Sequence, residues 1–171
     1  MTSAIILAVV AFLSTTILHL GVLKWCSGGM ARIPLRISAR TVAIMCLLFA
    51  AHMLQIGIYA GIFAFAERGL ALGSFTGTPL NTPLDYYYFS AVSYTSLGFG
   101  DVLPTRHLRF LTGVEALNGL LLIAWSASFL YTIMDRLWIW HPCVGPDGPP
   151  RDMSGRGPAP KRQQDDTGKQ D

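Results

Sequence analysis

The stretch TSLGFGD, residues 95–101, holds the residues of this chain whose types and spacing are best suited to bind an ion. Glycine adopts backbone dihedral angles that are closed to other residues. Two glycines that alternate with larger residues therefore let successive carbonyl oxygens point to one side. Rings of such carbonyls replace the hydration shell of a cation in selective pores. The stretch predicts a binding chemistry based on backbone oxygens.

The elements that must position this stretch are helices that cross a membrane. Hydrophobic residues make up 51% of the 171 residues and charged residues only 13%, against about 25% charged residues in soluble domains. Residues 1–23 and 41–66 carry no charge, and residues 110–134 carry only Glu115. Each run reaches the roughly 20 apolar residues that cross a bilayer core. We therefore expect an all-α membrane protein with three transmembrane helices.

A shorter helix is predicted between the second and third membrane spans, over about residues 85–95. Asp85 follows a proline and a leucine, and its carboxylate can cap the helix start by accepting from unpaired backbone N–H groups. The helix is too short to cross the membrane. Irregular backbone at membrane depth is tolerated only where protein buries it or where it lines a water-filled path. The sequence thus predicts a re-entrant helix followed by an ion-binding turn.

The N-terminal run is predicted to be a retained helix, residues 1–25. A secretory signal peptide needs a positively charged start, and the first basic residue here is Lys24, after the apolar run.

The basic residues predict the orientation of the chain. They gather in residues 26–40, which we expect to form a cytoplasmic loop, and in residues 139–171. Loops rich in Lys and Arg stay in the cytoplasm. The N-terminus and the region around residues 67–109 are then outside, in a multi-pass protein of the plasma (inner) membrane. Residues 139–171 are rich in Pro, Gly and charge and are expected to be a disordered cytoplasmic tail.

Several functional classes fit the sequence poorly. Cys26, Cys46 and Cys143 form no disulfide framework, and no Cys/His spacing suggests a zinc site. The membrane spans hold too few charged groups for a nucleophile–base pair or a metal cluster, so we do not expect an enzyme or a cofactor. The net charge of +3 follows from membrane topology and calls for no nucleic-acid partner.

Residues 95–101 resemble the potassium-channel signature Thr-Thr-Val-Gly-Tyr-Gly-Asp. The preceding YFSAVSYT, the proline at position 104 and the run EALNGLLL extend the resemblance over residues 41–138, and small bacterial ion-channel proteins have the most similar pattern. The resemblance implies a two-helix pore unit, a pore helix and a selectivity filter formed by Ser96, Leu97, Gly98, Phe99 and Gly100. K⁺ is the implied permeant ion.

The resemblance also implies roles outside the filter. Asp101 is expected at the outer mouth, where a carboxylate attracts cations. The side chains of Leu97 and Phe99 are expected to point back into the scaffold. One filter per chain requires four chains around one axis, so a homotetramer in the lipid bilayer is implied.

The sequence departs from the signature at three positions. Ser96 replaces threonine and keeps a hydroxyl, Phe99 replaces tyrosine and loses one, and Val92 stands where some relatives carry a glutamate. Asp101 is therefore expected to lack a carboxyl partner. A nonselective K⁺/Na⁺ channel and a non-conducting subunit with a channel-like scaffold stay open as alternatives.

Other polar and small residues of the spans have open roles. Glu115 either supports the filter from behind through a serine or threonine, or faces the pore cavity, or lies near the outer interface. Gly119 is either a hinge or a close-packing glycine. His19, His52 and Gln55 are predicted to form hydrogen bonds between helices.

Overall fold

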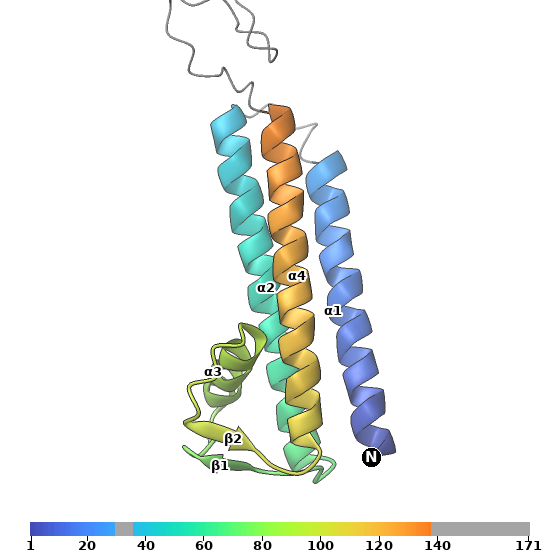
Figure 1. The fold of residues 1–171 in the computed structure, drawn as a ribbon, viewed down its shortest axis with the longest axis vertical. Coiled ribbons are helices and arrows are strands. Elements are labelled where there is room, and N and C mark those ends of the chain that lie inside the picture. Colours follow the sequence, from blue (N-terminus) through green and yellow to red (C-terminus); the bar gives the residue numbers. More distant parts are fainter. Residues whose placement is uncertain (30–35, 138–171) are drawn as a thin grey trace, which may run out of the picture. The chain divides into compact units, whose positions relative to one another are not determined.

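The computed structural model describes residues 1–29 and 36–137. Along the chain it contains α1 (Thr2–Gly28), α2 (Ile37–Arg68), β1 (Phe75–Gly77), α3 (Pro83–Tyr94), β2 (Val102–Pro104) and α4 (Leu108–Leu137) (Figure 1). The expected disordered tail, residues 139–171, lies outside the described residues.

Three of these helices, α1, α2 and α4, are long and apolar enough to cross a membrane. They match the three predicted spans, but each extends beyond the apolar run from which it was predicted. Helix α1 continues past Lys24, and α2 already includes Arg40. Lys and Arg favour helices, so an absence of charge marks the part that can cross a membrane and not the helix ends.

Helices α2 and α4 contact each other and both of the other helices. Helix α1 packs against both, and α3 packs against α2 on one side and α4 on the other. Aromatic rings fill the space where α2, α3 and β1 meet. The ring of Phe89 lies 5.1 Å from that of Phe63 and 4.7 Å from that of Phe75, at interplanar angles of 80° and 65°. This edge-to-face packing fixes α3 against α2.

Helix α3 begins with a capping box, in which the Asp85 carboxylate accepts from backbone N–H groups at the helix start, as predicted. The N-cap is Thr82, whose hydroxyl oxygen accepts from the Asp85 N–H at 3.3 Å. The Asp85 carboxylate accepts in return from the N–H groups of Thr82 and Asn81, at 2.7 and 2.9 Å. These hydrogen bonds lower the pKa of Asp85, and the bond from the backbone N–H of Thr82 has the largest effect. Pro83 fits the first helical position because its missing N–H would be unpaired there anyway.

A short antiparallel sheet, which the sequence did not predict, adds to the mostly helical structure. Phe75 pairs with Pro104, Thr76 with Leu103 and Gly77 with Val102. Strands of three residues are too short to show an alternating pattern in the sequence. The sheet brings the chain before α3 next to the chain that follows residues 95–101. The chain that leads into α3 and the chain that leaves the glycine-rich segment therefore lie together at one end of the long helices. The N-terminus lies at the same end (Figure 1).

Candidate functional site

The glycine-rich segment, residues 95–101, leaves the end of α3 and is exposed along its whole length in the single chain. Its backbone alternates in conformation. The φ angles of Ser96, Gly98 and Gly100 are 58°, 57° and 78°, whereas those of Leu97 and Phe99 are not positive. Alternation between left- and right-handed conformations turns successive N–H groups to one side. The carbonyl groups then face the opposite side.

Hydrogen bonds show which side faces α3. The N–H of Ser96 donates to the carbonyl of Ser93 at 2.9 Å, and the N–H of Leu97 donates to that of Val92 at 3.0 Å. Within the two described ranges, no hydrogen bond is accepted by a carbonyl oxygen of residues 96–100. The N–H side of the segment is thus bound to the last turn of α3, and its carbonyl oxygens are available to a ligand.

The conformation of Ser96 was not expected from the sequence. A residue other than glycine in the left-handed region costs about 1–2 kcal/mol, and sequence reasoning assigned special dihedral angles to the glycines alone. One signal was present: Ser96 precedes Gly98 by the same two positions that separate Gly98 from Gly100.

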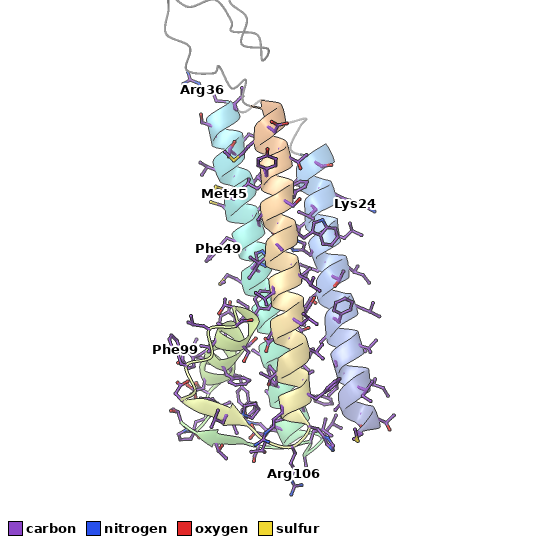
Figure 2. The ribbon with its side chains drawn as sticks, viewed as in Figure 1. Lys24, Arg36, Met45, Phe49, Phe99 and Arg106 are labelled. Atoms are coloured by element: carbon purple, nitrogen blue, oxygen red, sulfur yellow. The ribbon has the colours of Figure 1, made fainter. Side chains whose placement is uncertain are left out.

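The prediction that Leu97 and Phe99 point back into the scaffold concerns the assembled filter and stays a prediction, since the structure contains a single chain. Their side chains are 60% and 64% exposed. Figure 2 shows Phe99 pointing away from the helices. One chain covers only the N–H side of the segment, so burial of these two side chains requires contact with something outside this chain.

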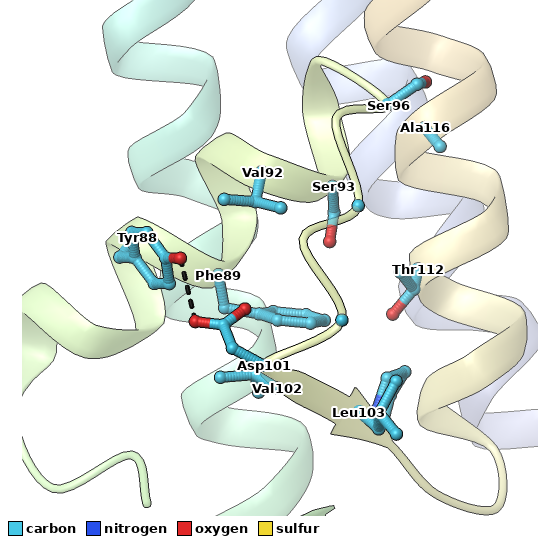
Figure 3. Close-up of a pocket in the computed structure, with 13 residues that line it drawn as sticks. Tyr88, Phe89, Val92, Ser93, Ser96, Asp101, Val102, Leu103, Thr112 and Ala116 are labelled. Carbon is cyan, nitrogen blue, oxygen red and sulfur yellow. Dashed lines mark hydrogen bonds between the residues drawn. The ribbon is translucent and has the colours of Figure 1, made fainter. Parts of the chain in front are cut away.

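Asp101 has a partner that the sequence analysis missed. The hydroxyl of Tyr88 donates to Asp101 Oδ2 at 2.8 Å (Figure 3). The bond to this carboxylate raises the pKa of Tyr88. Tyr88 precedes Val92 by four residues, which places both on one face of α3. Asp101 has no carboxyl partner at position 92, as expected. It is paired instead with the hydroxyl of Tyr88, one helical turn before that position.

The backbone of Asp101 is held as well. Its carbonyl oxygen accepts from the N–H of Thr78 at 2.9 Å, beside β1. Gly77 makes this approach possible: its φ is 95°, and a Cβ there would collide with the same carbonyl oxygen. The far end of the segment is therefore anchored by α3 and by the strand before it.

We expect Tyr88→Phe to reduce ion flux severalfold without preventing folding, because it removes only the hydroxyl that orients Asp101. Flux into liposomes containing purified protein measures the effect. Tyr131→Phe is the matched control, since Tyr131 is 74% exposed on α4. Equal flux in wild type and Tyr88→Phe would show that the Tyr88–Asp101 bond has no role at this site.

Glu115 is fully buried behind α3. The hydroxyl of Ser90, on α3, contacts Glu115 Oε1 at 2.5 Å and the carbonyl oxygen of Ile56, on α2, at 2.9 Å. Of the three roles considered for Glu115, the contact with a serine behind the segment is the one that the structure contains.

Gly119 packs tightly against the end of α3. A Cβ at this position would collide with the carbonyl oxygen of Tyr94. The close-packing role is therefore present in the structure, whereas a single conformation does not test a hinge.

A mostly apolar cavity of about 270 Å³ lies between α3, the glycine-rich segment and α4. Val92 and Ser93 line it from α3, Ser96 from the segment, and Thr112 and Ala116 from α4 (Figure 3). The cavity thus lies between the segment and α4. Among the described residues, no group of three or more His, Cys, Asp or Glu side chains could hold a metal ion.

Comparison with known protein families gives a match over residues 45–136, more than half of the chain, to a family described as ion channel. No curated protein and no solved structure matches the chain significantly. The matched range begins in α2 and ends in α4, so it contains α3, both strands and the glycine-rich segment.

Proposed function

Because the chain belongs to the ion channel family, we propose that it conducts K⁺ selectively and passively through a filter formed by Ser96, Leu97, Gly98, Phe99 and Gly100. Asp101 lies at the outer mouth of this filter in the proposal. The three long apolar helices make the chain a membrane protein, and α3 with residues 95–101 forms its re-entrant pore helix and filter.

The observation that carries the proposal is the backbone of the segment. Positive φ angles at Ser96, Gly98 and Gly100 alternate with φ angles that are not positive at Leu97 and Phe99. The carbonyl oxygens have no partner among the described residues, and the N–H groups of Ser96, Leu97 and Gly98 are bound to α3. A column of unpartnered carbonyl oxygens is suited to a cation that has lost its water.

A homotetramer completes the proposed site. One chain supplies one column of oxygens, and K⁺ filters use four such loops around an axis. The exposure of Leu97 and Phe99 supports this assembly, because neighbouring chains would cover these side chains. The C-terminal end of α3 carries about half a negative charge, and four such ends would favour a cation on the axis.

The orientation is part of the proposal. Lys24 and Arg36 lie toward one end of the helices, and Arg106 lies at the other (Figure 2). The end with Lys24 and Arg36 is cytoplasmic in the proposed topology, and the N-terminus and filter are outside. A cysteine introduced at Gly73 should react with an impermeant reagent in intact cells. Reaction only after the membrane is opened would contradict this orientation.

The direct test of the proposed function is ion flux. Purified protein in liposomes should pass K⁺ and exclude Na⁺ under matched gradients. Equal flux of the two ions would replace the proposal with a nonselective channel. No flux of either ion, from protein shown to be tetrameric, would favour a non-conducting subunit.

Removal of K⁺ should destabilise the tetramer. Unpartnered carbonyl dipoles that face one another repel, and a bound cation offsets this repulsion. A ligand that binds only the assembled state stabilises it by about 2.7 kcal/mol at a hundredfold excess over Kd. We therefore expect the detergent-solubilised tetramer to dissociate at a higher temperature in KCl than in NaCl or choline chloride, as measured by gel filtration. Ser96→Ala should reduce the difference, and identical midpoints in all three salts would count against a K⁺ site.

A further inference from the structure

Five polar side chains from all four helices meet behind the end of α3. They are His19 of α1, His52 and Gln55 of α2, Tyr94 of α3 and Ser126 of α4. Four of them are buried, and His52 is half-buried. Polar groups in such a place are costly unless each finds a hydrogen-bond partner. Their mutual distances show that they do.

The hydrogen bonds form a closed ring. The Tyr94 hydroxyl donates to Gln55 Oε1 at 2.6 Å, and its oxygen lies 2.9 Å from His52 Nδ1. His52 Nε2 lies 3.0 Å from Ser126 Oγ, which lies 3.2 Å from His19 Nε2. His19 Nδ1 lies 3.1 Å from Gln55 Nε2, which closes the ring.

The positions of the hydrogen atoms in the ring follow once the orientation of the Gln55 amide is known. The backbone carbonyl of Thr15 lies 3.4 Å from Gln55 Nε2 and can only accept, so it sets the orientation of the Gln55 amide. Gln55 then donates to His19, and Tyr94 donates to Gln55.

The remaining bonds have one solution with both imidazoles neutral. His52 Nδ1 donates to Tyr94, Ser126 donates to His52 Nε2, and His19 Nε2 donates to Ser126. Every member of the ring thus gives one hydrogen bond to the next and accepts one from the member before, and the N–H of His52 Nδ1 is shared with Gln55 Oε1, which lies 3.1 Å from it. Bonds that run in one direction polarise one another and strengthen the whole chain of bonds.

The ring is attached to the glycine-rich segment through Tyr94. Tyr94 is the last residue of α3, two positions before Ser96, and its carbonyl oxygen packs against Gly119. The ring therefore fixes the side chain, and Gly119 fixes the backbone, of the residue from which the segment departs. One ring member, His19, belongs to α1, which lies outside the range that matches the ion channel family.

We propose that this ring positions the ion-conducting segment through Tyr94, and that α1, through His19, is part of the conduction machinery. Tyr94, His52, Gln55, Ser126 and His19 are positioning residues, since none of them belongs to the segment itself. The inference rests on the proposed function of residues 96–100 and extends it to a helix with no other assigned role.

The experiment compares Tyr94→Phe, His19→Leu and the double variant with wild type. The first removes one hydroxyl, and the second removes the contribution of α1. We expect each single variant to lower the ratio of K⁺ to Na⁺ flux by at least about fivefold, the effect of one lost hydrogen bond, because each removes both ring bonds of one member. The double variant should lower the ratio by less than the two single effects multiplied together, because both variants remove members of the same ring. Tyr59→Phe is the matched control: its hydroxyl is also buried and accepts from Asn118 at 3.0 Å, outside the ring.

A conservative pair separates positioning from general loss of structure. Ser126→Ala should lower the flux ratio, and Ser126→Thr, which keeps the hydroxyl, should retain it. Unchanged ratios in Tyr94→Phe and His19→Leu, with selective wild type, would overturn the inference and leave the proposed function intact.

Hydrogen exchange of a peptide that covers residues 90–101 gives a second readout that does not depend on selectivity. It should be faster in both single variants than in wild type and Tyr59→Phe. If wild type showed no preference for K⁺, the proposed function would fail. Faster exchange would still support the positioning role, and unchanged exchange would overturn it.

Discussion

Gly98→Ala should abolish K⁺ flux and leave a folded tetramer. The φ angle of Gly98 is 57°, and no heavy atom lies within 4 Å of an added Cβ. The substitution therefore acts through the backbone and not through a collision within the chain. A side chain in the left-handed region costs about 1–2 kcal/mol, and in the proposed tetramer the cost applies to four chains at one narrow site. If φ becomes negative to relieve it, the alternation is broken and a ring of carbonyl oxygens turns away from the axis.

Ser96 shows that a residue with a side chain can adopt a left-handed conformation in this segment, so the difference between Ser96 and Gly98 must be explained. Its N–H is bound to the carbonyl of Ser93 at 2.9 Å, in the last turn of α3. Gly98 lies further along the segment, where its N–H is 3.5 Å from the nearest acceptor, the carbonyl of Val92. The backbone at Gly98 is thus less able to resist the change.

Flux in liposomes and gel filtration of the same preparation measure both parts of this prediction. Gly21→Ala in α1 is the matched control, since no atom lies within 4 Å of its added Cβ either. A Gly98→Ala channel with full and selective flux would remove residues 96–100 from the ion path.

Gly119→Ala should destabilise the protein strongly. The added Cβ would collide with the carbonyl oxygen and carbonyl carbon of Tyr94. These are backbone atoms, so a change of side-chain rotamer cannot relieve the collision and α3 must move away from α4. Overpacking of this kind costs typically about 1–3 kcal/mol per site. The shift would also pull the Tyr94 hydroxyl out of the ring.

Thermal unfolding of the purified protein tests this second prediction. Gly113→Ala on the same helix is the matched control, because an added Cβ there has no atom within 4 Å. It should unfold like wild type, or at a slightly higher temperature, since alanine favours helices. An unchanged midpoint in Gly119→Ala would mean that α3 and α4 can separate at no cost.

The long helices could be predicted from the sequence because the membrane imposes a simple rule. Residues 1–23, 41–66 and 110–134 hold almost no charge, and three helices contain these runs. Their ends could not be predicted, since Lys24 and Arg40 are compatible with a helix that leaves the apolar layer. The start of α3 at Pro83 was missed by two residues because both Thr82 and Asp85 can cap a helix, and only their reciprocal hydrogen bonds show that Thr82 is the N-cap residue.

The candidate segment could be found in the sequence from its glycines. The hydrogen bonds and strands that hold it in place could not. Tyr88 and Asp101 lie 13 positions apart, and nothing in either residue indicates that they are bonded. The strands pair residues on either side of α3, so they depend on how α3 folds back. The prediction that His19, His52 and Gln55 form hydrogen bonds between helices is confirmed. The closed ring was not foreseen, because His19 and Ser126 are 107 positions apart.

The pairing of β1 with β2 has a consequence for how this protein could be re-engineered. The ladder holds Phe75 beside Pro104, so the two ends of the intervening chain are fixed to each other and not only to the long helices. The entropy of closing such a loop grows only slowly with its length. Pro79, between the Thr78–Asp101 hydrogen bond and the capping box, is therefore a suitable insertion point. Inserted tags or sensor peptides there would lengthen a loop that is already closed, and the register of α3 and the segment behind it would be preserved.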